Sequence, residues 1–297
     1  MLRMGRHIIL CLPTLYPTVS KSAVQASYRL SAADKIYDDN GKTELLREDF
    51  SINCKQIQPG ILAKASQTTN IASVLYYDNL RKPGSSFSIG ASYISVFTNS
   101  QIDLAGLDAN VSEVASDLGA IGCSAFNVSN INYFGDISLG VRQLIQSEHL
   151  SVDLGASVLV PPNQTRRVLE EKRSLAASFY LEPAITYGRV SISTPAELIL
   201  STQNTKLDHN ISVKLSLNSI ALTDAEASVS FLVIRQEKQF VNTVFNVLVS
   251  SYSDSVEARF DATFGSGLVV SVTAVAAIAG RNSLAERAVE VSLGYLN

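Results

Sequence analysis

Residues 256–264 read VEARFDATF and alternate strictly between apolar and polar side chains. The apolar set shares one face of an extended chain and the polar set shares the other: Val256, Ala258, Phe260, Ala262 and Phe264 against Glu257, Arg259, Asp261 and Thr263. A period of two predicts a β-strand with one apolar and one charged face. Similar alternation recurs along most of the chain, so we predict an all-β protein, either a barrel or a sandwich.

The alternation is nearly continuous from residue 136 onward. It predicts strands at residues 137–142, 150–158, 175–187, 188–200, 211–217, 225–235, 240–250, 256–264, 268–279 and 288–296. Short turns are expected between the later strands, at residues 236–238, 251–253 and 265–267. The N-terminal third is less regular, with strands expected at residues 50–57, 71–77 and 86–97.

Residues 99–130 are the least strand-like part of the chain. Apolar side chains recur there at spacings of three and four residues, namely Leu104, Leu107, Val111, Val114 and Leu118. That spacing is typical of an amphipathic helix. We expect a short helical or loop insertion near this segment, with two poorly patterned strands as the alternative.

The composition excludes some classes of function. Charged residues make up 17% of the chain and its mean hydropathy is +0.16, whereas soluble domains average about 25% charge. The net charge of −3 provides no basic surface, so we expect no nucleic-acid partner. No apolar run reaches the length of about 18 residues that a membrane-spanning helix needs.

The N-terminus has features of an export signal. Arg3 and Arg6 precede an apolar stretch at residues 7–17, and small residues near Ala26 offer a cleavage site. We predict a signal peptide at residues 1–26 followed by a single β-barrel domain at residues 27–297, because no linker divides the rest. A buried N-terminal strand or helix is the alternative.

The number of expected strands favours a closed barrel. We count about twelve strands, and open sheets of that size tend to curl or split. Closure removes both sheet edges, and closed barrels satisfy every backbone group in lipid. We therefore predict an antiparallel transmembrane up-and-down barrel, with a polar inner face. The candidates to line its lumen are Arg142, Asp153, Lys214, Glu226, Glu257, Arg259, Asp261 and Glu290. Their signs are mixed, so they predict neither an anion nor a cation preference.

Residues 135–142 (GDISLGVR) and 150–161 (LSVDLGASVLVP) form an expected hairpin. This hairpin resembles one found in many Gram-negative outer-membrane barrels. It is most similar to the transporter barrels grouped with the meta-pathway of phenol degradation, and more distantly to the long-chain fatty-acid channel type. The resemblance implies a location in the outer membrane, contact with the lipid bilayer, insertion by the barrel assembly machinery, and passage of small, apolar or aromatic solutes.

The chain departs from such barrels in some features. It has no Trp and ends in Asn297, whereas these barrels carry aromatic girdles and usually end in an aromatic residue. Several tyrosines are expected to fill the girdle role in part: Tyr76, Tyr77, Tyr93, Tyr187, Tyr252 and Tyr295. If the C-terminus is periplasmic, the strand count also places the charged loop at residues 163–173 on the periplasmic side.

Catalytic motifs are missing from the sequence. It contains no phosphate-binding loop, dinucleotide fingerprint or zinc spacing, so we expect no cofactor and no metal. His149 and His209 are expected in turns, and Cys54 and Cys123 could pair in an oxidising compartment. We expect a passive channel or transporter and no enzymatic activity. The alternatives are a secreted β-sandwich with a structural or adhesive role and an outer-membrane enzyme that uses one of the two histidines.

Overall fold

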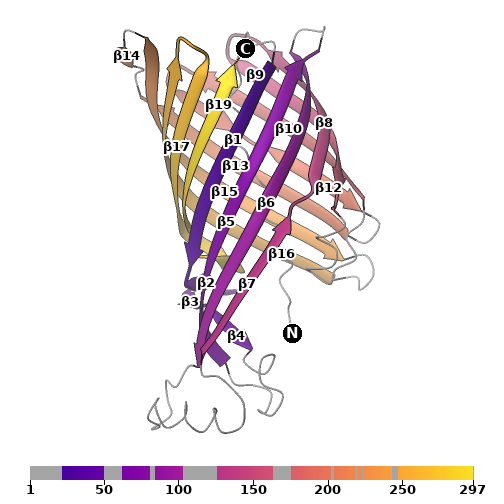
Figure 1. Cartoon of the computed structure of the whole chain (residues 1–297), viewed down its shortest axis with the longest axis vertical. Helices are drawn as coiled ribbons and strands as arrows, with labels where there is room; N and C mark the ends of the chain where they lie inside the picture. The colour runs from indigo at the N-terminus through magenta and orange to yellow at the C-terminus, as the bar shows by residue number, and fades with distance from the viewer. Residues whose placement is uncertain are drawn as a thin grey trace.

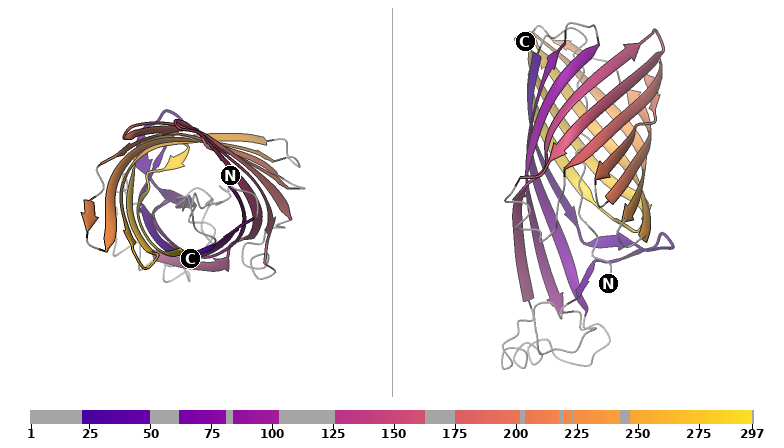
Figure 2. Two further views of the ribbon diagram at one scale, coloured as in Figure 1. Left: turned by 90° about the horizontal axis from the view of Figure 1, so that it is seen from above. Right: turned by 90° about the vertical axis from the view of Figure 1, so that its right-hand side faces the viewer.

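The computed structural model describes residues 22–49, 62–80, 84–102, 126–162, 175–201, 204–217, 220–222, 224–242 and 247–296. These residues form a closed barrel of 12 antiparallel strands, seen from the side in Figure 1 and from above in Figure 2. The prediction of an all-β up-and-down barrel is confirmed. The structure is one closed sheet and not two packed sheets, so the sandwich alternative is not favoured.

The strands follow one another around the wall in chain order. They are β1 (Ser22–Ala33), β5 (Leu62–Asn79), β6 (Ser85–Ile102), β7 (Phe126–Phe134) with β8 (Ile137–Gln146), β9 (Leu150–Val160), β10 (Ala176–Tyr187), β11 (Val190–Ser193) with β12 (Ala196–Ser201), β13 (Asn204–Ser216), β15 (Ala225–Asn242), β16 (Val247–Phe264), β17 (Leu268–Arg281) and β19 (Arg287–Leu296). Short strands β4 (Arg47–Asp49) and β14 (Ile220–Leu222) extend the sheet beside β5 and β15. Because β7 and β8 both pair with β6, and β11 and β12 both pair with β13, each of these couples forms one wall position.

The first and last strands close the barrel. Their antiparallel register runs from Ala23 opposite Leu296 to Ala32 opposite Arg287. The predicted signal boundary after Ala26 therefore falls inside β1, whose first residues also pair with β5. Cleavage there would remove the partners of Leu293 to Leu296. The cleavage itself stays a prediction.

The two ends of the barrel differ in their connections. β1 begins and β19 ends at the upper end in Figure 1. At that end β8 is joined to β9, β10 to β11 and β16 to β17 by two or three residues each. β9 ends and β10 begins at the opposite end. Residues 163–173, predicted to lie at the same end as the C-terminus, are themselves outside the described residues.

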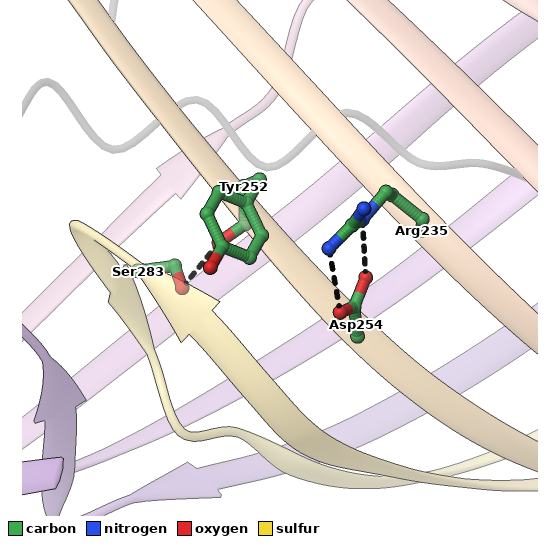
Figure 3. Close-up of polar contacts among 4 residues, drawn as sticks. All are labelled: Arg235, Tyr252, Asp254 and Ser283. Carbon is green, nitrogen blue, oxygen red and sulfur yellow. Dashed lines mark hydrogen bonds and ion pairs between the residues drawn. The ribbon is translucent and has the colours of Figure 1, made fainter. Parts of the chain in front are cut away.

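The sequence pattern predicted one strand too many. β15 and β16 run without a break through residues 236–238 and 251–253, which were expected to be turns, so the strand expected at residues 240–250 does not exist. Both segments are polar because the outward side chains of β15 and β16, and not only the inward ones, form polar pairs in this part of the wall. Figure 3 shows Arg235 on β15 donating to Asp254 on β16, at 2.8 and 3.1 Å, with its guanidinium 5.0 Å from the ring centre of Tyr252.

A small three-stranded sheet caps part of the end opposite the start of β1 and the end of β19. It comprises β18 (Ser283–Leu284), β2 (Lys35–Tyr37) and β3 (Thr43–Leu45). In the turn between β2 and β3, the Asp38 carboxylate accepts the backbone N–H groups of Lys42 at 2.7 Å and Asn40 at 2.8 Å. These hydrogen bonds hold the pKa of Asp38 below its ordinary value.

The segment expected to form an insertion begins and ends in strands. β6 runs to Ile102 and β7 begins at Phe126, so both ends of the segment at residues 99–130 are strands and not part of an insertion. The helix expected between them lies outside the described residues, as do Cys54, Cys123 and the strand expected at residues 50–57. No helix in the described ranges is long and apolar enough to cross a membrane.

Two turn glycines provide a matched test of the turns at the terminal end. Both have positive φ, but a Cβ on Gly267 would lie 2.3 Å from the carbonyl oxygen of Leu296, whereas a Cβ on Gly188 would meet nothing within 4 Å. Gly188→Ala should therefore lower the free energy of unfolding by about 1 kcal/mol, the cost of placing Ala in the left-handed backbone conformation. Gly267→Ala should cost about 2 kcal/mol, because the last residues of β19 must also move. Denaturant unfolding in lipid vesicles measures both, and equal costs would contradict the assigned contact.

Candidate functional site

The exposure pattern along each strand identifies the outer and inner faces. On β19, Val289, Val291, Leu293 and Tyr295 are 42–53% exposed, whereas Glu290 and Ser292 between them are 7% and 2% exposed. Directly opposite residues of paired strands share a face, so the register extends this assignment around the barrel. The outer face is apolar and the inner face carries most of the charge and hydroxyl groups.

Aromatic residues are also distributed by face. Tyr93, Tyr187 and Tyr295 are exposed on the outer face, and the Tyr93 ring makes an edge contact with Phe134 at 5.3 Å between centroids. Tyr77 points inward and its hydroxyl donates to Gln25 at 3.1 Å. Tyr77 therefore does not belong to the outward girdle expected from six tyrosines.

The structure places all eight predicted lumen candidates on the inward face. The register places other polar residues opposite three of them: Glu226 lies opposite Thr263, Asp261 opposite Ser228 and Ser271, and Glu290 opposite Thr273 and Arg29. Asp153 and Glu290 are deeply buried, whereas Glu226 is exposed near the terminal end of the barrel. Whether any of them contacts a passing solute stays a prediction.

One group of inward charges joins β8, β9 and β10. The Arg142 Nη2 lies 2.8 Å from Asp153 Oδ2, and the Arg142 guanidinium lies 4.7 Å from the ring centre of Tyr180. The Tyr180 hydroxyl donates to Glu182, which is directly opposite Asp153 in the register. Arg142 therefore lies between a carboxylate and an aromatic face, the arrangement that a planar guanidinium favours.

A second group follows on β12 and β13. Glu197 lies directly opposite Asp208, and Lys206 Nζ is 3.4 Å from Asp208 Oδ2. The hydroxyl of Ser178 on β10 donates to Glu197. Two directly opposite carboxylates repel each other, so this part of the wall needs the nearby cation.

A third group lies across β16, β17, β19 and β1. Arg259 donates to Asp261 at 2.8 Å, and the Ser271 hydroxyl also donates to Asp261. Arg29 forms an ion pair of 3.1 Å with Glu286, which precedes β19. The three groups together surround much of the inner wall with alternating charge.

Several inward residues escaped the sequence prediction. They are Arg29, Tyr180, Glu182, Glu197, Lys206 and Asp208. Pro183 and Pro195 weakened the two strands that carry Tyr180, Glu182 and Glu197. Lys206 and Asp208 lie between the strands predicted at residues 188–200 and 211–217, although they alternate with the outward Leu207, and that alternation is the available signal.

The inner wall is apolar on one side. Ile71 on β5, Ile94 and Val96 on β6, and Tyr133 on β7 form a buried cluster at 1–5% exposure, with Ile131 packed against it. These side chains lie directly opposite one another across the three strands. Arg29 of the third charged group lies directly opposite Ile71, so the charged part of the wall adjoins this cluster between β1 and β5.

His149 and His209, the histidines among the described residues, do not form a common site. His149 lies in the turn between β8 and β9, with its Nε2 3.8 Å from Glu148 Oε1, and its ring is near that of Tyr187. His209 is in the middle of β13 and not in a turn, so that expectation is wrong. Among the residues placed by the structure, no group of three or more His, Cys, Asp or Glu side chains could hold a metal ion.

No family model matches the sequence, and no curated protein matches it. Among solved structures, an outer membrane channel from Pseudomonas putida F1 is similar over 98% of this chain and 100% of its own, with a TM-score of 0.57 and 8% identity. The shared property is the fold. KdgM porin is similar over 92% of this chain and 99% of its own, with a TM-score of 0.42 and 8% identity. The translocator domain of autotransporter NalP from Neisseria meningitidis is similar over 94% of this chain and 89% of its own, with a TM-score of 0.43 and 10% identity. Both are more remote and add nothing to the assignment of the fold.

Proposed function

We propose that this protein is an outer-membrane channel through which small solutes diffuse passively. The observation that carries the proposal is the inverted distribution of polarity, with apolar side chains exposed outside a closed barrel and ion pairs inside it. An apolar outer surface suits lipid, where a closed barrel leaves no backbone group unpaired. The similarity in fold to an outer membrane channel agrees with this proposal.

The barrel size supports a path for solutes. Side chains fill an eight-stranded barrel, and the interior widens with strand number. Twelve strands provide a wider interior, lined here by Ser, Gly and Thr as well as charge. We expect lipid and small solutes to be the partners, and insertion to require the barrel assembly machinery. The apolar or aromatic solutes implied by the sequence resemblance stay a prediction.

Two measurements on the purified protein test the proposal. Folded into lipid vesicles, the protein should migrate differently on a gel before and after boiling, as closed membrane barrels do. Vesicles that contain it should swell in an iso-osmotic solution of a small neutral sugar, at a rate that rises with the protein-to-lipid ratio. Vesicles with boiled protein are the control. A heat-dependent shift without swelling would contradict the channel and leave the barrel intact.

A further inference from the structure

Carboxylates outnumber cationic side chains on the inward face of the described strands. The inward cations are Arg29, Arg142, Lys206, Lys214, Lys238 and Arg259, and the inward carboxylates are Asp153, Glu182, Glu197, Asp208, Glu226, Glu257, Asp261 and Glu290. Glu286 adds a further negative charge through its ion pair with Arg29. The described inner wall is therefore negative overall, which the mixed signs in the sequence did not predict.

The ion pairs show where the excess lies. Asp153, Asp208, Asp261 and Glu286 each lie within 2.8–3.4 Å of a cation. Glu182, Glu197, Glu257 and Glu290, which we term the four lumen glutamates, form no ion pair with any residue that the structure describes. Glu182 and Glu197 accept hydrogen bonds from the neutral hydroxyls of Tyr180 and Ser178, which leave their charge in place.

Glu290 is a buried carboxylate without an ion pair of its own in the described part of the chain, which independently supports an excess of negative charge on the inner wall. Its side chain is buried, at 7% exposure, and its Oε1 accepts no hydrogen bond from the described residues. The cation directly opposite, Arg29, is engaged by Glu286. Arg29 and Arg259 attract the Glu290 carboxylate electrostatically, but neither forms an ion pair with it among the described residues. A solute cation held beside it would therefore lower the cost of burying its charge.

We propose that the channel prefers cationic solutes and that the four lumen glutamates produce this preference. The inference rests on the proposed function and specifies its class of solute. The glutamates lie on β10, β12, β16 and β19, so their field acts from several sides of the wall. Rings of carboxylates select cations in other channels by the same attraction. Three of the four are only partly buried and reach the inner surface.

Ion selectivity in a planar bilayer tests the proposal. The reversal potential is measured across a gradient of KCl at low ionic strength, because screening at about 0.1 M already limits the field to about 10 Å. The wild-type protein should favour K⁺ over Cl⁻. Replacing all four lumen glutamates with Gln keeps the hydrogen-bond acceptors and should lower the K⁺/Cl⁻ permeability ratio by about fivefold or more, the effect of one unit charge about 4 Å from an ion in water.

Glu237→Gln is the matched control. Glu237 is exposed on the outer face of β15, so its replacement should leave the permeability ratio unchanged. Should the fourfold variant fail to fold, Glu182→Gln and Glu257→Gln are measured singly. A wild-type channel that is unselective or prefers Cl⁻, or a ratio that the replacements do not change, would overturn the inference and leave the channel standing. Folded barrels without conductance would overturn both the cation preference and the proposed channel function.

Discussion

Replacing Arg142 with Leu should lower the free energy of unfolding by about 3–5 kcal/mol, because the substitution leaves a buried carboxylate without its counter-charge. Asp153 is only 3% exposed and its Oδ2 lies 2.8 Å from the Arg142 guanidinium. Glu182 lies directly opposite Asp153, and its repulsion would then no longer be offset by Arg142. The contact of the guanidinium with the Tyr180 ring is lost as well. Equilibrium unfolding in denaturant, with the protein in lipid vesicles, measures the change.

A double-mutant cycle separates charge from packing. Asp153→Asn in the Arg142→Leu background removes the carboxylate charge that has lost Arg142, and it should recover part of the lost stability. Arg142→Lys keeps the charge but not the planar contact with Tyr180, so an intermediate loss is expected. If the double variant is no more stable than Arg142→Leu, then Asp153 does not depend on Arg142 for its charge.

The second large effect is expected on the outer face. Leu293→Arg should lower the free energy of unfolding by about 1–2 kcal/mol, because Leu293 lies near the end of β19 and the cost of a cation on the lipid-facing surface falls from the middle of the bilayer toward its interfaces. Leu293 is 53% exposed and lies directly opposite Ala26 on β1 and Val270 on β17, so its outward neighbours are apolar. The fraction of protein that shows the heat-dependent gel shift should fall in parallel.

Gln239→Arg is the matched control for this substitution. Gln239 is also exposed on an outer face, but Glu237 precedes it on that face of β15 and Ser250 lies opposite it on β16, with Leu207 opposite it on β13. The same new side chain should change stability there by no more than about 0.5 kcal/mol. Equal losses at both positions would contradict the assignment of the apolar surface to lipid.

Strand alternation predicted the faces well because it is a local property. Neighbouring side chains of a strand point to opposite sides whatever the strand pairs with. All eight lumen candidates therefore lie on the inward face, including Glu257, Arg259 and Asp261 of the most regular segment. The same rule misled where both faces of a strand are polar. Residues 236–238 and 251–253 show no alternation of apolar and polar side chains, so the pattern predicts turns there and one strand too many.

The sequence could not predict which charges meet. Arg142 and Asp153 share a hairpin, but Arg29 pairs with Glu286 across the closure between β1 and β19. That pairing depends on the register of strands at opposite ends of the chain. Register is a property of long-range hydrogen bonding and not of local pattern, and the alternation alone allows any even shift.

The amino-acid order thus determines, by its period of two, that the chain forms strands with one apolar and one polar face. Closure, the sidedness of the connections and the excess of negative charge inside were decided by the tertiary structure. The physical reason is that each of them depends on non-local pairing: β1 with β19 for closure, the true number of strands for sidedness, and the alignment of β10, β12, β16 and β19 for the charge.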